Sequence, residues 1–307
     1  MISFRYHLVS IIGIFLALAL GIVVGTTALN GPITTDLRHQ VDALKKDRSS
    51  LSSQVNNLRD QVANGQKFAV TFGPQIVDGQ LVGQNALIIG MPGADSAIKD
   101  GVTKQVIAAG GKVTGRLQIT SDYTDPKRAG DIIALTTSVH PIGLVLPPTD
   151  DSGAQGGALL AYVLLGKGAS KQTDLQQVLA GFAELHMLKV EGGDNVTPAT
   201  MVVVVASGTL PVGNAGGKTQ LSLVTELQRA GGHVVVVGNP LSATAGGAVA
   251  LVRGDDVAKT TVSTVDNADS AVGQVATVLA LVSVAKFKPG HYGTGSGASD
   301  LFPEPVK

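Results

Sequence analysis

The distribution of apolar and polar residues divides the chain into three stretches. The first, residues 8–28, has no charged side chain, and its polar side chains are Ser10, Thr26 and Thr27. A helix of this length spans about 30 Å at about 1.5 Å per residue, which matches the hydrocarbon core of a bilayer. A helix also satisfies its own backbone hydrogen bonds, as lipid requires. The pattern predicts one transmembrane helix after a short flank at residues 1–7.

A cleaved secretory signal peptide is the alternative for this segment. The apolar core of a signal peptide is usually about 7–15 residues long, shorter than this run, and its basic flank is here reduced to Arg5. Thr26 and Ala28 leave a weak small-x-small cleavage signal. We therefore expect an anchor that is not cleaved.

Small residues recur at every fourth position of this helix: Gly13, Ala17, Gly21 and Gly25. Small side chains at this spacing let two helix backbones approach closely in a membrane, and Gly21 with Gly25 forms a G-x-x-x-G motif. Small residues are also common in membrane helices generally. The uninterrupted series favours a helix–helix interface.

The second stretch, residues 33–64, repeats its apolar residues every seven positions, and Asn64-Gly65 is expected to end its helix. It follows Asn30-Gly31-Pro32, which we expect to end the membrane helix. Leucine occupies one position of the repeat, and mostly valine the position four residues later: Leu37, Leu44, Leu51, Leu58, and Val41, Arg48, Val55, Val62. A β-branched residue at a and leucine at d are typical of a parallel two-stranded coiled coil, and a strict period of seven indicates a supercoil. We predict a parallel homodimer.

Two features of this repeat leave a second structure open. Arg48 occupies an a position, where a charged side chain costs stability. The e and g positions hold few pairs of opposite charge: Arg38, Gln40, Lys45, Asp47, Ser52, Gln54, Arg59 and Gln61. The alternative is a helix that packs its Leu/Val face on its own globular domain.

The third stretch, residues 85–293, follows a linker at residues 65–84 and repeats a strand–helix–strand pattern. Apolar runs predict strands at residues 86–89, 112–119, 201–206, 233–237 and 260–265. Helices are expected at residues 97–109, 219–230 and 270–286. Runs such as residues 202–205 do not alternate with polar residues, so they indicate strands buried on both faces of a parallel sheet. This pattern predicts an α/β fold with a Rossmann-like, doubly wound sheet.

The segments around this repeat are less regular. Residues 122–198 form an apparent insertion, with a short strand expected at residues 142–146 and helices at residues 154–165 and 174–188. Residues 294–307 are expected to form a flexible tail.

Composition narrows the classes of function. Lys+Arg and Asp+Glu both total 23, so the net charge is zero and there is no basic field of the kind that nucleic acid binding needs. Cysteine is absent, which excludes disulfides, thiolate metal sites and cysteine nucleophiles.

No set of residues predicts an enzyme. Gly217-Lys218-Thr219 lies between a strand and a helix, but a phosphate loop needs glycine where Val212 stands. Gly90-Met91-Pro92-Gly93 lacks the spacing of a dinucleotide fingerprint, and Ser207-Gly208 lacks the preceding glycine of a nucleophile elbow. We predict no catalytic and no cofactor-binding residue.

Two short segments are weak candidates for a metal site. Asp266, Asn267 and Asp269 follow a strand at its carboxyl end, where α/β folds bind ligands, and could offer oxygen ligands to a hard cation. Turn formation and helix capping are the alternative. His186 and Met187 are adjacent soft ligands, but neighbours on a helix point about 100° apart and seldom share one ion.

Flanking charges give little guidance on the orientation of the membrane helix. Arg5 precedes it, whereas Arg38, Lys45, Lys46 and Arg48 follow it, and the positive-inside count alone favours a cytoplasmic globular domain. Long domains, however, cross membranes largely regardless of such charges. We expect a single-pass protein of the cell membrane or cell envelope with its globular domain extracytoplasmic.

Nearly the whole chain resembles the actinobacterial MctB-type copper transport proteins. The matching segments are residues 1–7 (MISFRYH), 15–21 (FLALALG), 264–269 (TVDNAD), 274–276 (QVA), 279–281 (LAL) and 290–293 (GHYG). The resemblance implies a cell-envelope protein whose bulk lies outside the cytoplasm and whose role is copper efflux or homeostasis. The family label also implies that such a protein forms a channel in an outer membrane.

Two functions of different classes follow. The first is a copper transport component of the envelope, as the resemblance implies. The second is a non-enzymatic envelope scaffold or regulator that recruits protein partners through its coiled coil, for instance in cell-wall remodelling. The residues themselves predict no channel, because outer-membrane pores need strands that alternate apolar and polar residues. Beyond Met1, the sulfur ligands are Met91, Met187 and Met201.

Overall fold

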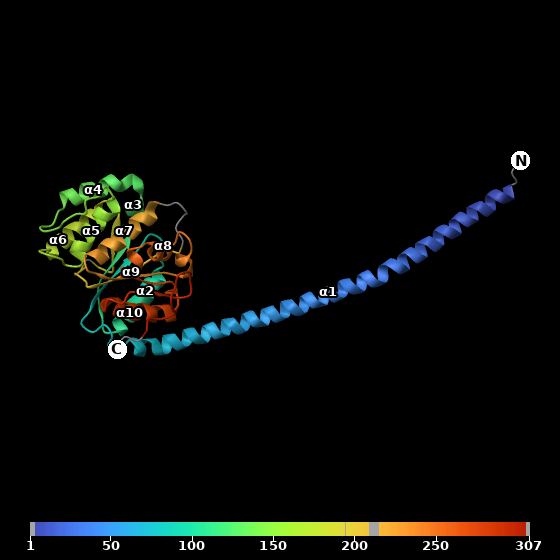
Figure 1. Cartoon of the computed structure of the whole chain (residues 1–307), viewed down its shortest axis with the longest axis horizontal. Helices are drawn as coiled ribbons and strands as arrows, with labels where there is room; N and C mark the ends of the chain where they lie inside the picture. Colours follow the sequence, from blue (N-terminus) through green and yellow to red (C-terminus); the bar gives the residue numbers. More distant parts are fainter. Residues whose placement is uncertain (1–3, 194, 209–214, 305–307) are drawn as a thin grey trace. The chain divides into compact units, whose positions relative to one another are not determined.

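The chain forms one long helix followed by an α/β fold (Figure 1). The structure, a computed structural model, describes residues 4–193, 195–208 and 215–304, without the side chains of residues 27–36 and 215. It divides into two compact units, Met1–Asn64 and Gly65–Lys307, which we call the stalk unit and the α/β unit.

Helix α1 (Phe4–Val77) is continuous. The break expected at Asn30-Gly31-Pro32 and the helix end expected at Asn64-Gly65 are therefore wrong. A proline inside a helix removes one backbone hydrogen bond and costs about 3 kcal/mol, and a long helix can accommodate that loss locally. Among the described helices, α1 alone is long and apolar enough to cross a membrane, over Phe4–Thr26 with a mean hydropathy of 2.8.

The α/β unit contains one sheet of seven described strands in the order β3-β2-β1-β4-β5-β6-β7. The strands are β1 (Asn85–Gly90), β2 (Lys112–Ile119), β3 (Leu188–Glu191), β4 (Met201–Val205), β5 (His233–Val237), β6 (Ser263–Val265) and β7 (His291–Tyr292). Neighbouring strands are parallel except for β3, which is antiparallel to β2. The sheet runs outward from β1 in both directions, so the prediction of a doubly wound fold is confirmed.

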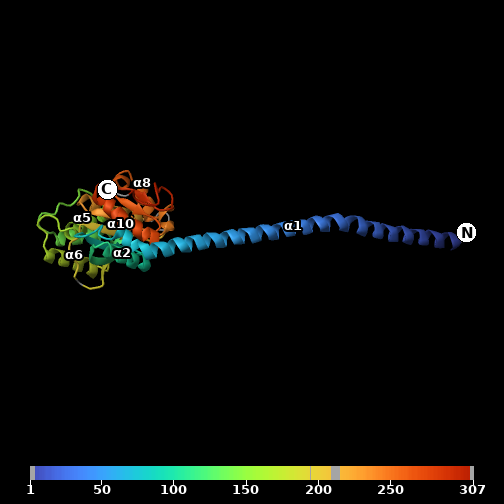
Figure 2. The same ribbon diagram turned by 90° about the horizontal axis from the view of Figure 1, so that it is seen from below.

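Helices cover both faces of this sheet (Figures 1 and 2). One face packs on α2 (Ser96–Ala108), α10 (Ala271–Ala285) and the end of α1. The other packs on longer helices and short helical turns: α3 (Ser121–Thr124), α4 (Ala129–Ser138), α5 (Ser152–Leu164), α6 (Gln172–Glu184), α7 (Ala215–Arg229), α8 (Ala248–Gly254) and α9 (Ala258–Thr261). Two 3-10 turns complete the described helices: Pro126–Arg128 and Pro240–Ala243.

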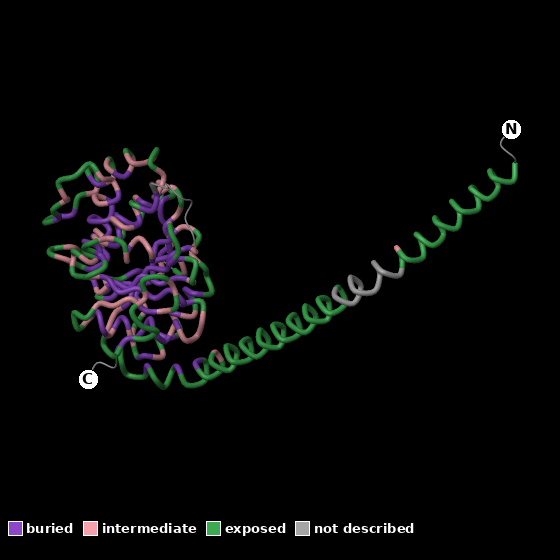
Figure 3. Tube along the Cα trace, turned by 45° about the vertical axis from the view of Figure 1, so that its right-hand side comes forward, coloured by how far each residue is buried: buried purple, intermediate pink, exposed green. Residues whose placement is uncertain are grey.

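The valine runs lie inside the sheet, as their pattern predicts. Val203 belongs to the core beneath α2 and α10, whereas Val202 and Val204 belong to the core beneath α5 and α7. Successive side chains of a strand point to opposite faces, so a strand covered on both sides needs no polar alternation. Figure 3 shows this buried centre in purple.

Three predicted segments differ from the structure. Residues 142–146 form no strand, because Gly143 adopts φ +87° and Pro141 and Pro147 flank the run. The helix expected at residues 174–188 ends at Glu184 and is followed by β3, which the sequence did not predict. The strand expected at residues 260–265 is shortened to β6 by the turn α9.

The expected linker at residues 65–84 is also wrong, because the last turns of α1 belong to the α/β unit and pack on α10. Gln66 Oε1 accepts a hydrogen bond of 2.7 Å from the N–H of Ala271, the first residue of α10. A Cβ at Gly73 would lie 2.7 Å from Val275 Cγ2, so glycine permits this close approach. Val77 and Leu81 are fully buried. The helix therefore ends inside the core it supports.

Candidate functional site

The carboxyl edge of the sheet holds the oxygen ligands proposed from the sequence. Asp266, directly after β6, is fully buried, and its carboxylate lies 2.8 Å from Arg253 Nη1. It also accepts hydrogen bonds from the N–H groups of Thr294 at 2.7 Å and Gly295 at 3.0 Å. Gly293 (φ +124°) passes so close that a Cβ there would lie 2.2 Å from Asp266 Oδ1. This carboxylate is a buried anchor for the end of the chain.

Arg253, on α8, uses all three guanidinium nitrogens. Nε donates to Thr264 Oγ1 at 2.9 Å, and Nη2 donates to the carbonyl of Tyr292 at 3.0 Å. Nη1 donates to Asp266 and to the carbonyl of Ser296 at 2.7 Å. The flexible tail expected at residues 294–307 is therefore wrong for this part, because the segment after β7 is bonded to a buried ion pair.

His291, the first residue of β7, extends this network. Its Nδ1 lies 3.0 Å from Thr264 Oγ1, and its Nε2 lies 3.0 Å from the carbonyl of Lys259. Arg253 already donates to the Thr264 oxygen, so the hydroxyl proton is directed to Nδ1 and Nε2–H donates to Lys259. Burial, and then the charge of Arg253, lower the pKa of His291. The geometry favours a neutral imidazole.

Asn267 and Asp269 do not complete a cation site with Asp266. Asn267 is buried and its Oδ1 has no hydrogen-bond partner among the described residues. Asp269 is exposed at the surface, where partial burial first, and then the charges of Asp95 and Asp266, raise its pKa. Within the described ranges, no three His, Asp or Glu side chains gather around a point that could hold a metal ion.

His186 and Met187 lie in different environments. His186 is exposed with φ +58°, and its Nδ1 lies 3.3 Å from the carbonyl of Ala183. Met187 is fully buried in the core beneath α5 and α6. Met91 shares that core, whereas Met201 lies on the other face of the sheet. The soft ligands named from the sequence are not brought together.

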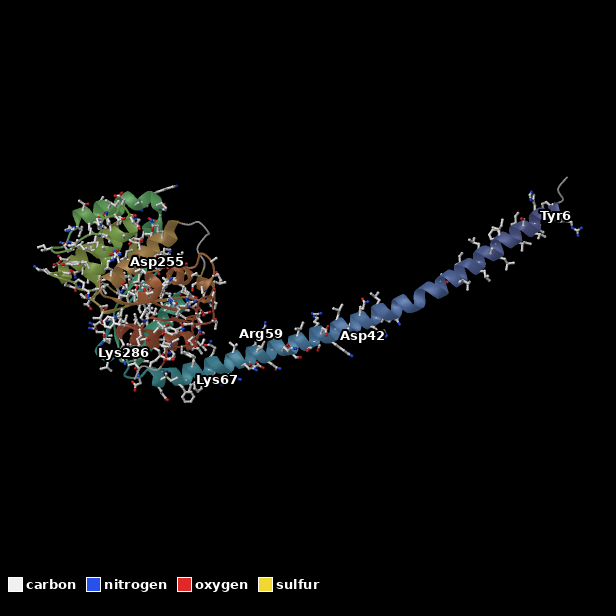
Figure 4. All side chains as sticks on the ribbon, in the orientation of Figure 1. Tyr6, Asp42, Arg59, Lys67, Asp255 and Lys286 are labelled. Carbon is white, nitrogen blue, oxygen red and sulfur yellow. The ribbon has the colours of Figure 1, made fainter. Side chains whose placement is uncertain are left out.

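The residues proposed for a helix–helix interface all lie along α1. The leucines and valines of the heptad series are exposed by between 41% and 67%: Leu37, Val41, Leu44, Leu51, Val55 and Leu58. Apart from the neighbouring backbone of the helix, no described atom lies within 4 Å of the position that a Cβ would take at Gly13, Gly21 or Gly25. Figure 4 shows the stalk side chains standing away from the helix, among them Asp42 and Arg59. The series is therefore available for a partner.

Sequence reasoning missed the residues that hold the buried carboxylate. Arg253, Thr264 and His291 belong to three different elements, α8, β6 and β7, and the fold brings them together. One sequence feature could have indicated them: residues 264–269 and 290–293 are both among the segments that match the family. The resemblance assigns these segments no role.

These features define a class: an α/β protein with a candidate membrane-spanning helix near its amino end. The family model described as "Copper transport outer membrane protein, MctB" matches residues 1–303. Proteins named "Copper transporter MctB" from Mycobacterium tuberculosis and Mycobacterium bovis are 31% identical to this chain, over 98% of it and 99% of their own length. The Mycobacterium leprae protein of that name is 29% identical over the same shares. The chain belongs to the MctB family.

Proposed function

We propose that this chain is a copper-homeostasis component of the cell envelope, a single-pass membrane protein that works as a parallel homodimer. Its α/β unit lies on the extracytoplasmic side. The family match over residues 1–303 is the observation that carries the proposal. The relatives are named copper transporters, so copper ions are the cargo that we assign to this chain.

The fold favours a role beside other envelope proteins rather than a pore in the chain itself. The central strands of the described sheet are covered by helices on both faces, so they enclose no lumen. Met91 and Met187 are buried in one core, Met201 is buried on the other face of the sheet, and His186 is exposed. We therefore assign the chain a non-enzymatic part in copper export, in which it organises partners in the membrane or envelope.

The exposed heptad series supports the dimer. A stripe of leucine and valine along a helix is stable in water only when another surface covers it, and the a/d pattern fits a second parallel copy. The scaffold function shares this observation, because the same stalk could recruit envelope proteins during cell-wall remodelling. Copper content distinguishes the two functions.

The test is complementation of a deletion strain, with cellular copper measured by elemental analysis during growth in copper. We expect the deletion to raise cellular copper and the full chain to restore it. Leu44→Ala with Leu51→Ala should not restore it, because both residues lie on the proposed dimer seam, the a/d face of the heptad series where two parallel copies would meet. The matched control is Lys46→Ala with Ser53→Ala, which has the same spacing on the outer f positions and should restore it.

Each arm can contradict one part of the proposal. Unchanged copper content in the deletion strain would reject copper homeostasis and favour the scaffold function. Full restoration by the double leucine variant, at equal abundance in the membrane, would reject the need for a dimer.

A further inference from the structure

A second apolar stripe lies on α1 inside the α/β unit. Phe68, Phe72 and Ile76 are exposed by 59%, 44% and 46%. They are spaced four residues apart, so they lie on one face of the helix. The rings of Phe68 and Phe72 are in contact, with centroids 4.9 Å apart. Two aromatic rings and an isoleucine thus form a continuous exposed strip.

The α/β unit itself uses a different face of the same turns. Ala69 and Val77 are buried, Gly73 approaches Val275, and Gln66 caps α10. On a helix of about 100° per residue, these positions lie about 60° to 140° around the helix from Phe72, the centre of the strip. The strip is therefore not the face that docks α1 on its own unit.

The strip continues the heptad numbering of the stalk. Counting in sevens from Leu37 through Leu58 reaches Gly65 and then Phe72, a d position. Counting from Val41 through Val62 reaches Ala69 and then Ile76, an a position. The predicted coiled coil ends at residue 64 because Asn64-Gly65 is expected to end the helix, and the next two heptad positions are the small residues Gly65 and Ala69. Since α1 is continuous, the heptad register is kept as far as Phe72 and Ile76, although Ala69 itself is buried against the α/β unit and takes no part in the contact.

The charges along these turns agree with a second copy as the occupant. Between Gly65 and Val77 the charged residue is Lys67, which lies at an f position, the outermost of the heptad. Two parallel copies would therefore bring no like charges together at the strip. A parallel two-fold arrangement also places each residue opposite itself, which suits a strip that is apolar along its whole length.

We infer that the dimer seam extends beyond the stalk into the α/β unit, where Phe72 and Ile76, flanked by Phe68, pack against the same residues of a second copy. This rests on the parallel dimer of the proposed function and adds a defined contact between the two α/β units. The contact would fix the α/β units beside each other at the end of the stalk.

The absence of cysteine allows a direct test in the full chain. Single cysteines are introduced at Phe72→Cys and Ile76→Cys, and the protein is oxidised in isolated membranes with the copper-free oxidant diamide. A disulfide needs Cα atoms within about 7 Å, so a symmetric disulfide forms only where a residue faces its own copy. Leu51→Cys reports the stalk seam, and Ser53→Cys and Lys67→Cys are matched controls on the outer face.

We expect a covalent dimer from the variants at positions 51, 72 and 76, and about tenfold less from those at positions 53 and 67. Crosslinking at position 51 without crosslinking at 72 and 76 would overturn this inference and leave the dimer of the proposed function intact. A failure at all three positions would overturn both. Equal crosslinking at 67 and 72 would indicate random collision and also overturn the inference. Maleimide labelling after denaturation verifies that every variant carries its thiol.

Discussion

Arg253 Nη1 donates a hydrogen bond of 2.8 Å to Asp266 Oδ2, and the two side chains are only 5% and 0% exposed. Taking two charges out of water is costly, and their attraction offsets that cost only when other hydrogen bonds satisfy the remaining atoms. Here the N–H groups of Thr294 and Gly295 and the carbonyls of Tyr292 and Ser296 do so. The pair therefore joins β6, β7 and the segment that follows.

Asp266→Asn should strongly destabilise the α/β unit. The substitution keeps the shape of the side chain but leaves Arg253 buried without a counter-charge, which typically costs about 3–5 kcal/mol. The measurement is denaturant unfolding of the purified full chain in detergent. Asp256→Asn is the control, because that carboxylate pairs with Lys259 on the surface and its loss should leave the transition unchanged. If the Asp266→Asn protein unfolds at the same denaturant concentration as the unsubstituted chain, Asp266 does not stabilise the α/β unit as we propose.

His291 should make stability depend on pH. Because its pKa in the folded protein lies below the ordinary 6.5, the unfolded chain takes up a proton first as the pH falls. The contribution of neutral His291 to the free energy of unfolding is thus complete above about pH 6.5. It is lost as the pH falls towards the pKa of His291 in the folded protein. The melting temperature should drop between about pH 7.5 and pH 5.5, and less so in His291→Gln, which can keep both hydrogen bonds. Equal drops in melting temperature in both proteins would show that His291 does not cause the pH dependence of stability.

The central part of the fold could be predicted from the sequence because it depends on local pattern. The valine runs at residues 202–205 and 234–237 can be stable only between two layers, and glycines after α2 and α7, Gly110 and Gly231, end those helices in left-handed conformations. These rules need no knowledge of distant contacts.

The parts that could not be predicted depend on contacts between distant segments. Strand β3 is short and forms only because the edge of β2 is open to it. The segment after Gly293 has a flexible composition, yet it is held by a carboxylate at residue 266. Asp266 is a candidate ligand in the sequence because it follows a strand at its carboxyl end, and no neighbouring residue in the chain indicates that its partner is Arg253.

Copper should not bind tightly and stoichiometrically to the purified full chain. His186 is exposed and Met187 is buried, so the pair cannot close around one ion without rearrangement of the core. The measurement is copper retained after competition with a chelator of known affinity, with His186→Ala and Met187→Leu in parallel. Retention at micromolar affinity or tighter that these two substitutions abolish would contradict this expectation.

A reporter enzyme fused after Lys307 should be active when it requires export from the cytoplasm. The apolar segment Phe4–Thr26 is near the amino terminus, and a long domain can follow such an anchor across the membrane despite the basic residues behind it. The matched fusion carries a reporter that works only in the cytoplasm and should be inactive. The reverse result in both fusions would reject the extracytoplasmic placement.

The parallel dimer is the central claim, and sedimentation velocity of the full chain in density-matched detergent tests it most directly. Leu44→Ala with Leu51→Ala should separate the copies, because truncating a buried leucine costs about 2–5 kcal/mol and Arg48 already weakens the seam between them. Lys46→Ala with Ser53→Ala is the control on the outer face. We predict a dimer for the unsubstituted chain and the control at tens of micromolar, and a monomer for the double leucine variant. A monomeric unsubstituted chain at that concentration would contradict the account.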